Sequence, residues 1–124
     1  MWSPNWRFDD ATFERSAASF DNPDFVDVVI QSYRHRFGYA AGDPAFEALE
    51  ARLAARPPIA VPTIVLHGEG DGVASPSGSA SASQARFFTG PYQHRLIPVI
   101  GHNVPQEAPR ETAAAVLDLL GTTQ

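Results

Sequence analysis

Apolar residues recur at helical spacing through the first half of the chain and predict three helices, at about residues 10–20, 23–37 and 44–56. Each predicted helix follows side chains that can accept the free backbone N–H groups of a first turn: Asp9 or Asp10, Asn22, and Asp43. A proline comes next in the second and third helix, where its missing N–H group does no harm. We expect Gly38 to end the second helix and the proline pair at 57 and 58 to end the third.

The pattern changes after the two prolines. Residues 59–66 form an unbroken apolar run rich in β-branched side chains, which predicts a strand buried on both faces, as in a parallel sheet. A serine-rich loop at 75–83 and a short helix at 84–88 are expected next, followed by a second strand at 94–100. The last predicted element is a helix at 109–121.

A strand, a crossover with a helix, a second strand and a final helix form the unit that lays two parallel strands side by side. The predicted fold class is therefore α/β. The expected division is a helical segment at 1–57 followed by a βαβα unit at 58–124, the closing part of a parallel sheet.

The composition narrows the classes of partner and site. With 124 residues and 44% hydrophobic content, the chain can bury a core. The net charge is −5 and the nine basic residues are arginines scattered singly, so we expect no nucleic-acid partner. Without cysteine, and with histidines that lack metal-ligand spacing, we expect no metal and no cofactor. No secretory signal or membrane-spanning run is visible, so we expect no membrane association and a cytoplasmic location.

An acid and a histidine follow the two predicted strands. Asp71 comes after the first strand and His102 after the second, separated by the length of one loop, one helix and one strand. The carboxyl ends of neighbouring parallel strands meet at one edge of a sheet, so we expect the two side chains to lie together. A carboxylate beside an imidazole fixes the tautomer of the ring and stabilises the imidazolium that forms when the other nitrogen takes a proton.

The two segments resemble motifs of the α/β-hydrolase superfamily. Gly68 to Asp71 match its Gly-x-x-Asp, and Gly101 to Pro109 match its Gly-His-x-x-x-x-Glu-x-Pro, with Glu107 at the family's glutamate. The chain is thus similar to the C-terminal half of such an enzyme, with helical cap segments followed by the last two strands. The resemblance implies that Asp71 is the catalytic acid and His102 the catalytic base.

The nucleophile of that family is missing from this sequence. No Gly-x-Ser-x-Gly elbow, aspartate variant of it or HGGG segment precedes Asp71, and the serines of 75–83 lack the strand-to-helix context. We expect an incomplete hydrolase that is inactive alone and takes a small-molecule substrate once completed. With a serine nucleophile, His102 would be the general base of acyl transfer from an ester or amide. With an aspartate, it would activate water against an alkyl-enzyme ester, as in dehalogenases and epoxide hydrolases.

A competing hypothesis is a non-catalytic binding or scaffolding domain derived from that fold. The strand at 59–66 would then expose an edge that self-association or another partner could cover.

Several other side chains have two interpretations. Tyr33 continues an apolar stripe and is expected in a core, although it could instead polarise a leaving oxygen. His67 is expected to pack with its ring bonded to a backbone group, and His35 and His94 are expected at the surface or on a helix face. The aromatic cluster near the start is expected to pack, although it could line an acyl pocket: Trp2, Trp6 and Phe8.

Overall fold

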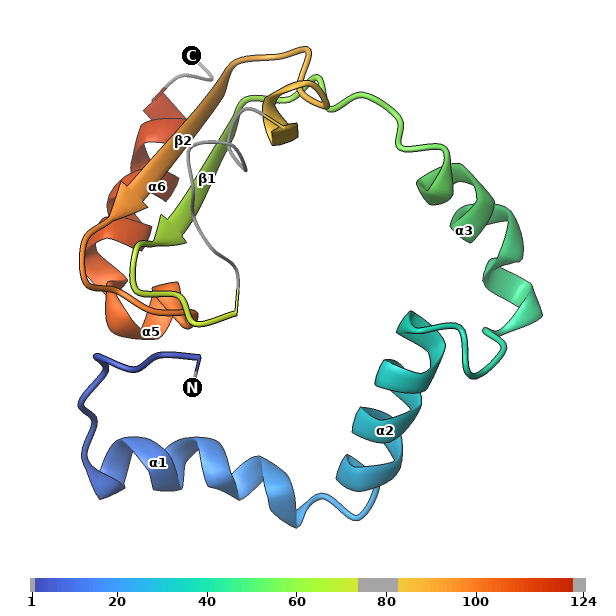
Figure 1. Ribbon diagram of the computed structural model, residues 1–124, viewed down its shortest axis with the longest axis horizontal. Coiled ribbons are helices and arrows are strands. Elements are labelled where there is room, and N and C mark those ends of the chain that lie inside the picture. Colours follow the sequence, from blue (N-terminus) through green and yellow to red (C-terminus); the bar gives the residue numbers. More distant parts are fainter. Residues whose placement is uncertain (1, 74–82, 122–124) are drawn as a thin grey trace. The chain divides into compact units, whose positions relative to one another are not determined.

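The computed structural model describes residues 2–73 and 83–121. The chain divides into two compact units (Figure 1). One unit is Arg7–Arg56, and the other combines Met1–Trp6 with Pro57–Gln124. Residues 2–6 thus fold with the C-terminal unit, which the sequence pattern does not indicate.

The unit Arg7–Arg56 is helical, as predicted. Its elements are α1 (Asp10–Ala17), the 3-10 helix η1 (Ala18–Asp21), α2 (Phe25–Arg36), the 3-10 helix η2 (Pro44–Phe46) and α3 (Glu47–Ala54). Asp9 caps α1 by accepting the Thr12 N–H at 2.8 Å, and hydrogen bonding from the Thr12 side chain, with that from its backbone, lowers the pKa of the Asp9 carboxyl. Asp43 accepts the Ala45 N–H at 2.9 Å at the start of η2. Two of the predicted caps are therefore confirmed.

The second helix begins later than predicted. The Asn22 side chain accepts the Asp24 N–H at 3.0 Å and its carbonyl accepts the Phe25 N–H at 2.9 Å, so the chain turns once before α2 begins. The end is as predicted, because Gly38 adopts a φ of 75°, which a glycine reaches without strain.

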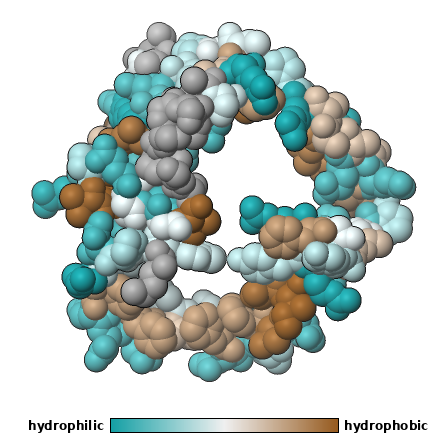
Figure 2. Space-filling view, viewed as in Figure 1, coloured by the Kyte–Doolittle hydropathy of each residue, from teal (hydrophilic) through white to brown (hydrophobic). Residues whose placement is uncertain are grey.

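The apolar side chains of this unit lie at its surface. None of the residues in α1, α2 and α3 is buried, and Figure 2 shows hydrophobic side chains exposed over α2. Tyr33, predicted to lie in a core, is 45% exposed and stacks on Phe37 with ring centroids 6.3 Å apart. The prediction of a core position is therefore wrong, because the Tyr33 ring lies at the surface and its stacking partner Phe37 follows the end of the same helix.

The C-terminal unit holds the parallel strands. Strand β1 (Thr63–Gly68) pairs in parallel with β2 (Tyr92–Ile97), with Thr63 opposite Tyr92 and Gly68 opposite Ile97. Helix α6 (Pro109–Gly121) lies along one face of the pair (Figure 1), and Arg95 of β2 reaches Asp118 of α6 at 2.7 Å. The predicted α/β fold class and the predicted last helix are confirmed.

Both strands are displaced from their predicted bounds. Before β1, Ile59 forms only an isolated parallel bridge with Phe88, and Pro62, which cannot donate a hydrogen bond, precedes the strand. Strand β2 ends at Ile97 because Pro98 has no N–H group and Val99 adopts a φ of 70°. The predicted helix at 84–88 is confirmed only in part, because helix is described at 83–85 and then gives way to turns in which Phe87 and Phe88 donate to the carbonyls three residues earlier. The predicted serine-rich loop lies outside the described residues except for its last position.

Candidate active site

The structure brings the two predicted site residues together. Asp71 follows β1 and His102 follows β2, and Asp71 Oδ2 lies 2.9 Å from His102 Nδ1. The Asp71 side chain is 6% exposed, whereas the His102 side chain is 37% exposed. The acid is therefore shielded from water, while the imidazole remains open to a reactant.

The turn that carries Asp71 is built tightly against the turn of His102. Asp71 Oδ1 accepts the Val73 N–H at 2.7 Å, so both oxygens of the carboxylate are bound. The Gly70 N–H donates to the Ile100 carbonyl at 2.8 Å. A Cβ atom at Gly68 would lie 2.1 Å from the same carbonyl oxygen, so only glycine fits there. The two turns thus meet backbone to backbone, which fixes the distance between acid and histidine.

Three consecutive backbone N–H groups anchor the histidine turn. Glu107, at the end of α5 (Val104–Glu107), accepts the Gly101 N–H at 2.8 Å and the Asn103 N–H at 3.0 Å. The His102 N–H between them donates to Ser3 Oγ at 3.0 Å and to the Trp2 carbonyl at 3.2 Å. Glu107, which the sequence motif singled out, therefore holds the backbone on both sides of His102.

The sequence interpretation missed the N-terminal contacts with this site. Residues 2–5, which we call the N-terminal segment, reach both turns. The Trp2 ring meets the His102 ring edge to face at 5.2 Å, and Asn5 Nδ2 donates to the Val99 carbonyl at 3.1 Å. Trp2 thus packs on the candidate base. One indirect signal existed: Gly101 suggests a close approach of another backbone, but the sequence does not say which.

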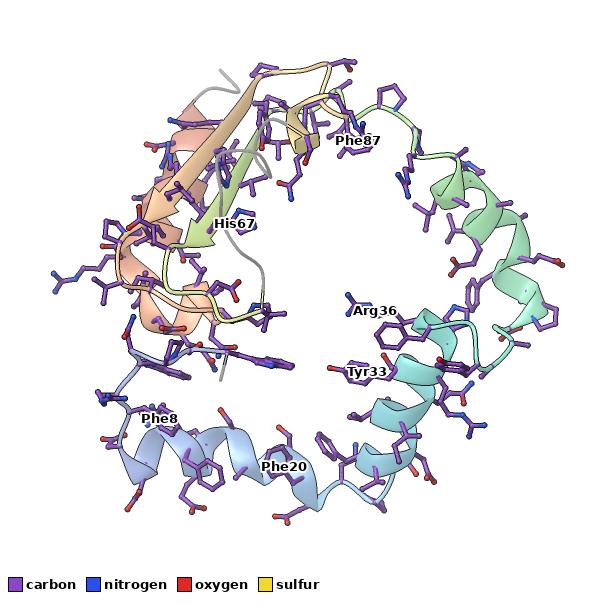
Figure 3. All side chains as sticks on the ribbon, in the orientation of Figure 1. Phe8, Phe20, Tyr33, Arg36, His67 and Phe87 are labelled. Atoms are coloured by element: carbon purple, nitrogen blue, oxygen red, sulfur yellow. The ribbon has the colours of Figure 1, made fainter. Side chains whose placement is uncertain are left out.

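A second pair of histidines lies on the strands themselves. His67 Nδ1 and His94 Nε2 are 2.7 Å apart, so a single hydrogen lies between the two rings. His67 projects from β1 on the side away from α6 (Figure 3). Burial, and secondly the neighbouring His67, lower the pKa of His94. The predictions that His67 bonds a backbone group and that His94 lies at the surface or on a helix face are wrong, because His94 is a half-buried residue of β2 and the parallel register puts both side chains on one face of the sheet.

The described ranges 2–73 and 83–121 contain no group of three or more histidine, aspartate or glutamate side chains able to hold a metal ion. Within the same ranges, no helix has both the length and the apolar character needed to cross a membrane.

The comparisons with known proteins found one relevant similarity. Neither a protein-family model nor a curated protein matches the chain. A crystal structure from Klebsiella pneumoniae, described as a putative epoxide hydrolase, matches with a TM-score of 0.88 and 46% identity. The match covers 95% of this chain but 38% of the Klebsiella chain, so this sequence spans well under half of that relative's length. Together with the parallel strands and the two motifs, the match shows that the chain has a partial α/β-hydrolase fold.

Proposed function

We propose that this chain supplies the acid and the base of a hydrolase active site, with Asp71 orienting His102. The 2.9 Å contact between Asp71 Oδ2 and His102 Nδ1 carries this proposal. A carboxylate only accepts, so the hydrogen lies on Nδ1 and the lone pair on Nε2. Nε2 is then the atom that takes a proton, and the carboxylate stabilises the imidazolium that results.

The nucleophile comes from residues outside this sequence, on the same polypeptide or on another. The description of the Klebsiella relative favours an epoxide substrate and hence a carboxylate nucleophile. The carboxylate oxygen attacks one epoxide carbon, the carbon–oxygen bond of the ring breaks, and the ring oxygen takes a proton. The product of this step is a hydroxyalkyl ester on the enzyme.

His102 acts in the second step. Its Nε2 takes a proton from water while the oxygen of that water attacks the carbonyl carbon of the ester. The tetrahedral intermediate collapses, the diol leaves with the proton from His102, and the carboxylic acid loses its proton. That last proton replaces the one used to open the ring, so epoxide and water give diol with no net change in the enzyme.

The substrate class can be tested in a chimaera in which this chain replaces the matched segment of the Klebsiella relative. Styrene oxide and p-nitrophenyl acetate are supplied in parallel, with the unaltered relative as a control. We expect conversion of styrene oxide to its diol. Hydrolysis of the ester alone would indicate a serine nucleophile, and a folded chimaera without either activity, beside an active control, would favour the scaffolding alternative.

A further inference from the structure

The N-terminal segment, residues 2–5, joins the two turns that form the candidate site. The Trp2 carbonyl accepts the Gly72 N–H at 3.0 Å and the His102 N–H at 3.2 Å. Gly72 directly follows Asp71 in the chain. One carbonyl oxygen therefore binds the backbone of the acid turn and the backbone of the histidine itself.

The Ser3 side chain adds a second anchor at the same position. Its Oγ accepts the His102 N–H at 3.0 Å and the Asn103 side-chain amide at 3.2 Å. A Cβ atom at Gly101 would lie 2.5 Å from Ser3 Cα, so the segment can approach this closely only because residue 101 is glycine. Glycine is therefore required at position 101, directly before the candidate base, because a side chain there would clash with Ser3.

The third contact acts on the imidazole ring. Asp71 binds Nδ1, and the Trp2 ring meets the imidazole edge to face with centroids 5.2 Å apart. The hydrogen bond to Asp71 fixes one edge of the ring, and the indole hinders its rotation. A ring that turned away would lose the Asp71 contact and with it the preference for a hydrogen on Nδ1.

We infer that the N-terminal segment is a positioning element for His102, with Ser3 and Trp2 holding its backbone and ring so that the imidazole stays bonded to Asp71. This inference rests on the proposed function for its catalytic meaning. The positioning of His102 depends only on contacts within this chain. It can therefore be measured on the full chain without any nucleophile.

The experiment is NMR of the imidazole hydrogens in the full chain, labelled with ¹⁵N. In the unaltered chain we expect one His102 tautomer, with the hydrogen on Nδ1 exchanging slowly with water. Ser3→Ala should speed that exchange at least tenfold and mix the two tautomers. Ser3→Thr keeps the hydroxyl and should restore the original behaviour, and Ser16→Ala, an exposed serine of α1, should change nothing.

An unchanged tautomer and an exchange rate within twofold in folded Ser3→Ala would overturn the inference. If Ser3→Ala does not fold, Trp2→Ala, which keeps the backbone carbonyl, tests the same claim with the same two readouts. In the chimaera, Ser3→Ala should lower kcat about tenfold and leave KM unchanged. If the chimaera is inactive while the NMR result is as expected, the proposed function fails and the positioning of His102 stands.

Discussion

Asp71 Oδ2 and His102 Nδ1 lie 2.9 Å apart although 31 positions separate the two residues in the chain. The parallel pairing of β1 with β2 explains this proximity, because both strands deliver their following turns to the same edge. The near-complete burial of the acid and the partial exposure of the histidine match the roles of an orienting carboxylate and a proton acceptor.

Replacing Asp71 by asparagine should show whether the carboxylate is needed to orient the His102 ring, because the size of the side chain is kept. Asp71→Asn keeps the size of the side chain, but its amide can donate a hydrogen bond to Nδ1 and favour the wrong tautomer. We expect kcat of the chimaera to fall by about 10²- to 10⁴-fold. Asp118→Asn, which removes the carboxylate of α6 that binds Arg95 of β2, is the matched control, and kcat should stay within twofold. Equal activity of the two variants would contradict the role of Asp71.

The Glu107 carboxylate should contribute measurably to the stability of the histidine turn. Glu107→Gln leaves one oxygen for two backbone donors, those of Gly101 and Asn103, and sets an amide group against the other donor. We expect a loss of about 1–3 kcal/mol in the free energy of unfolding, measured with urea. Glu111→Gln, on the exposed surface of α6, should change it by less than about 0.5 kcal/mol. A loss of equal size in both variants would contradict the role of Glu107 in stabilising the histidine turn.

Gly68 should be intolerant of even one added carbon. In Gly68→Ala the new Cβ atom would approach the backbone oxygen of Ile100, which cannot move without shifting the histidine turn. We expect a loss of about 3 kcal/mol in stability. Gly121→Ala, at the last position of α6, provides the contrast, because no atom of the described residues lies within 4 Å of the added Cβ, and we expect stability to change by less than about 0.5 kcal/mol. Thermal unfolding of both variants checks the pair, and a neutral Gly68→Ala would contradict the close packing of the turns.

Stability should fall as the pH drops below the ordinary histidine range. The pKa of His94 is lowered in the folded chain from its ordinary value of 6.5, so below that pH the unfolded state binds a proton that the folded state refuses. The free energy of unfolding should therefore decrease as pH falls from about 6.5 towards the folded pKa. His94→Gln should flatten this dependence, whereas His35→Gln, on exposed α2, should not. A slope unchanged by His94→Gln would exclude the histidine pair as its cause.

The sequence was sufficient to predict the helices, the parallel sheet and the approach of Asp71 to His102, because each depends on a local pattern or on the direction of neighbouring strands. The bounds of the strands depend on Pro62 and Pro98, which limit the backbone pairing of β1 and β2. The apolar pattern runs on past both prolines and therefore does not mark these bounds. The His67–His94 pair requires the register of two strands, in which Val65 faces His94.

The N-terminal contacts could not be predicted for a different reason. They join residues 99 and 100 positions apart through a serine hydroxyl, and neither a backbone carbonyl nor a single serine leaves a pattern in the sequence.

The most direct test of the account is the intact mass of the His102→Ala chimaera after reaction with styrene oxide. We predict that turnover falls by at least about 10²-fold and that the protein gains the mass of one epoxide, because the ester forms while its hydrolysis lacks a base. His35→Ala should turn over normally without a stable adduct. Undiminished turnover by the His102→Ala chimaera would contradict the assignment of His102 as the base.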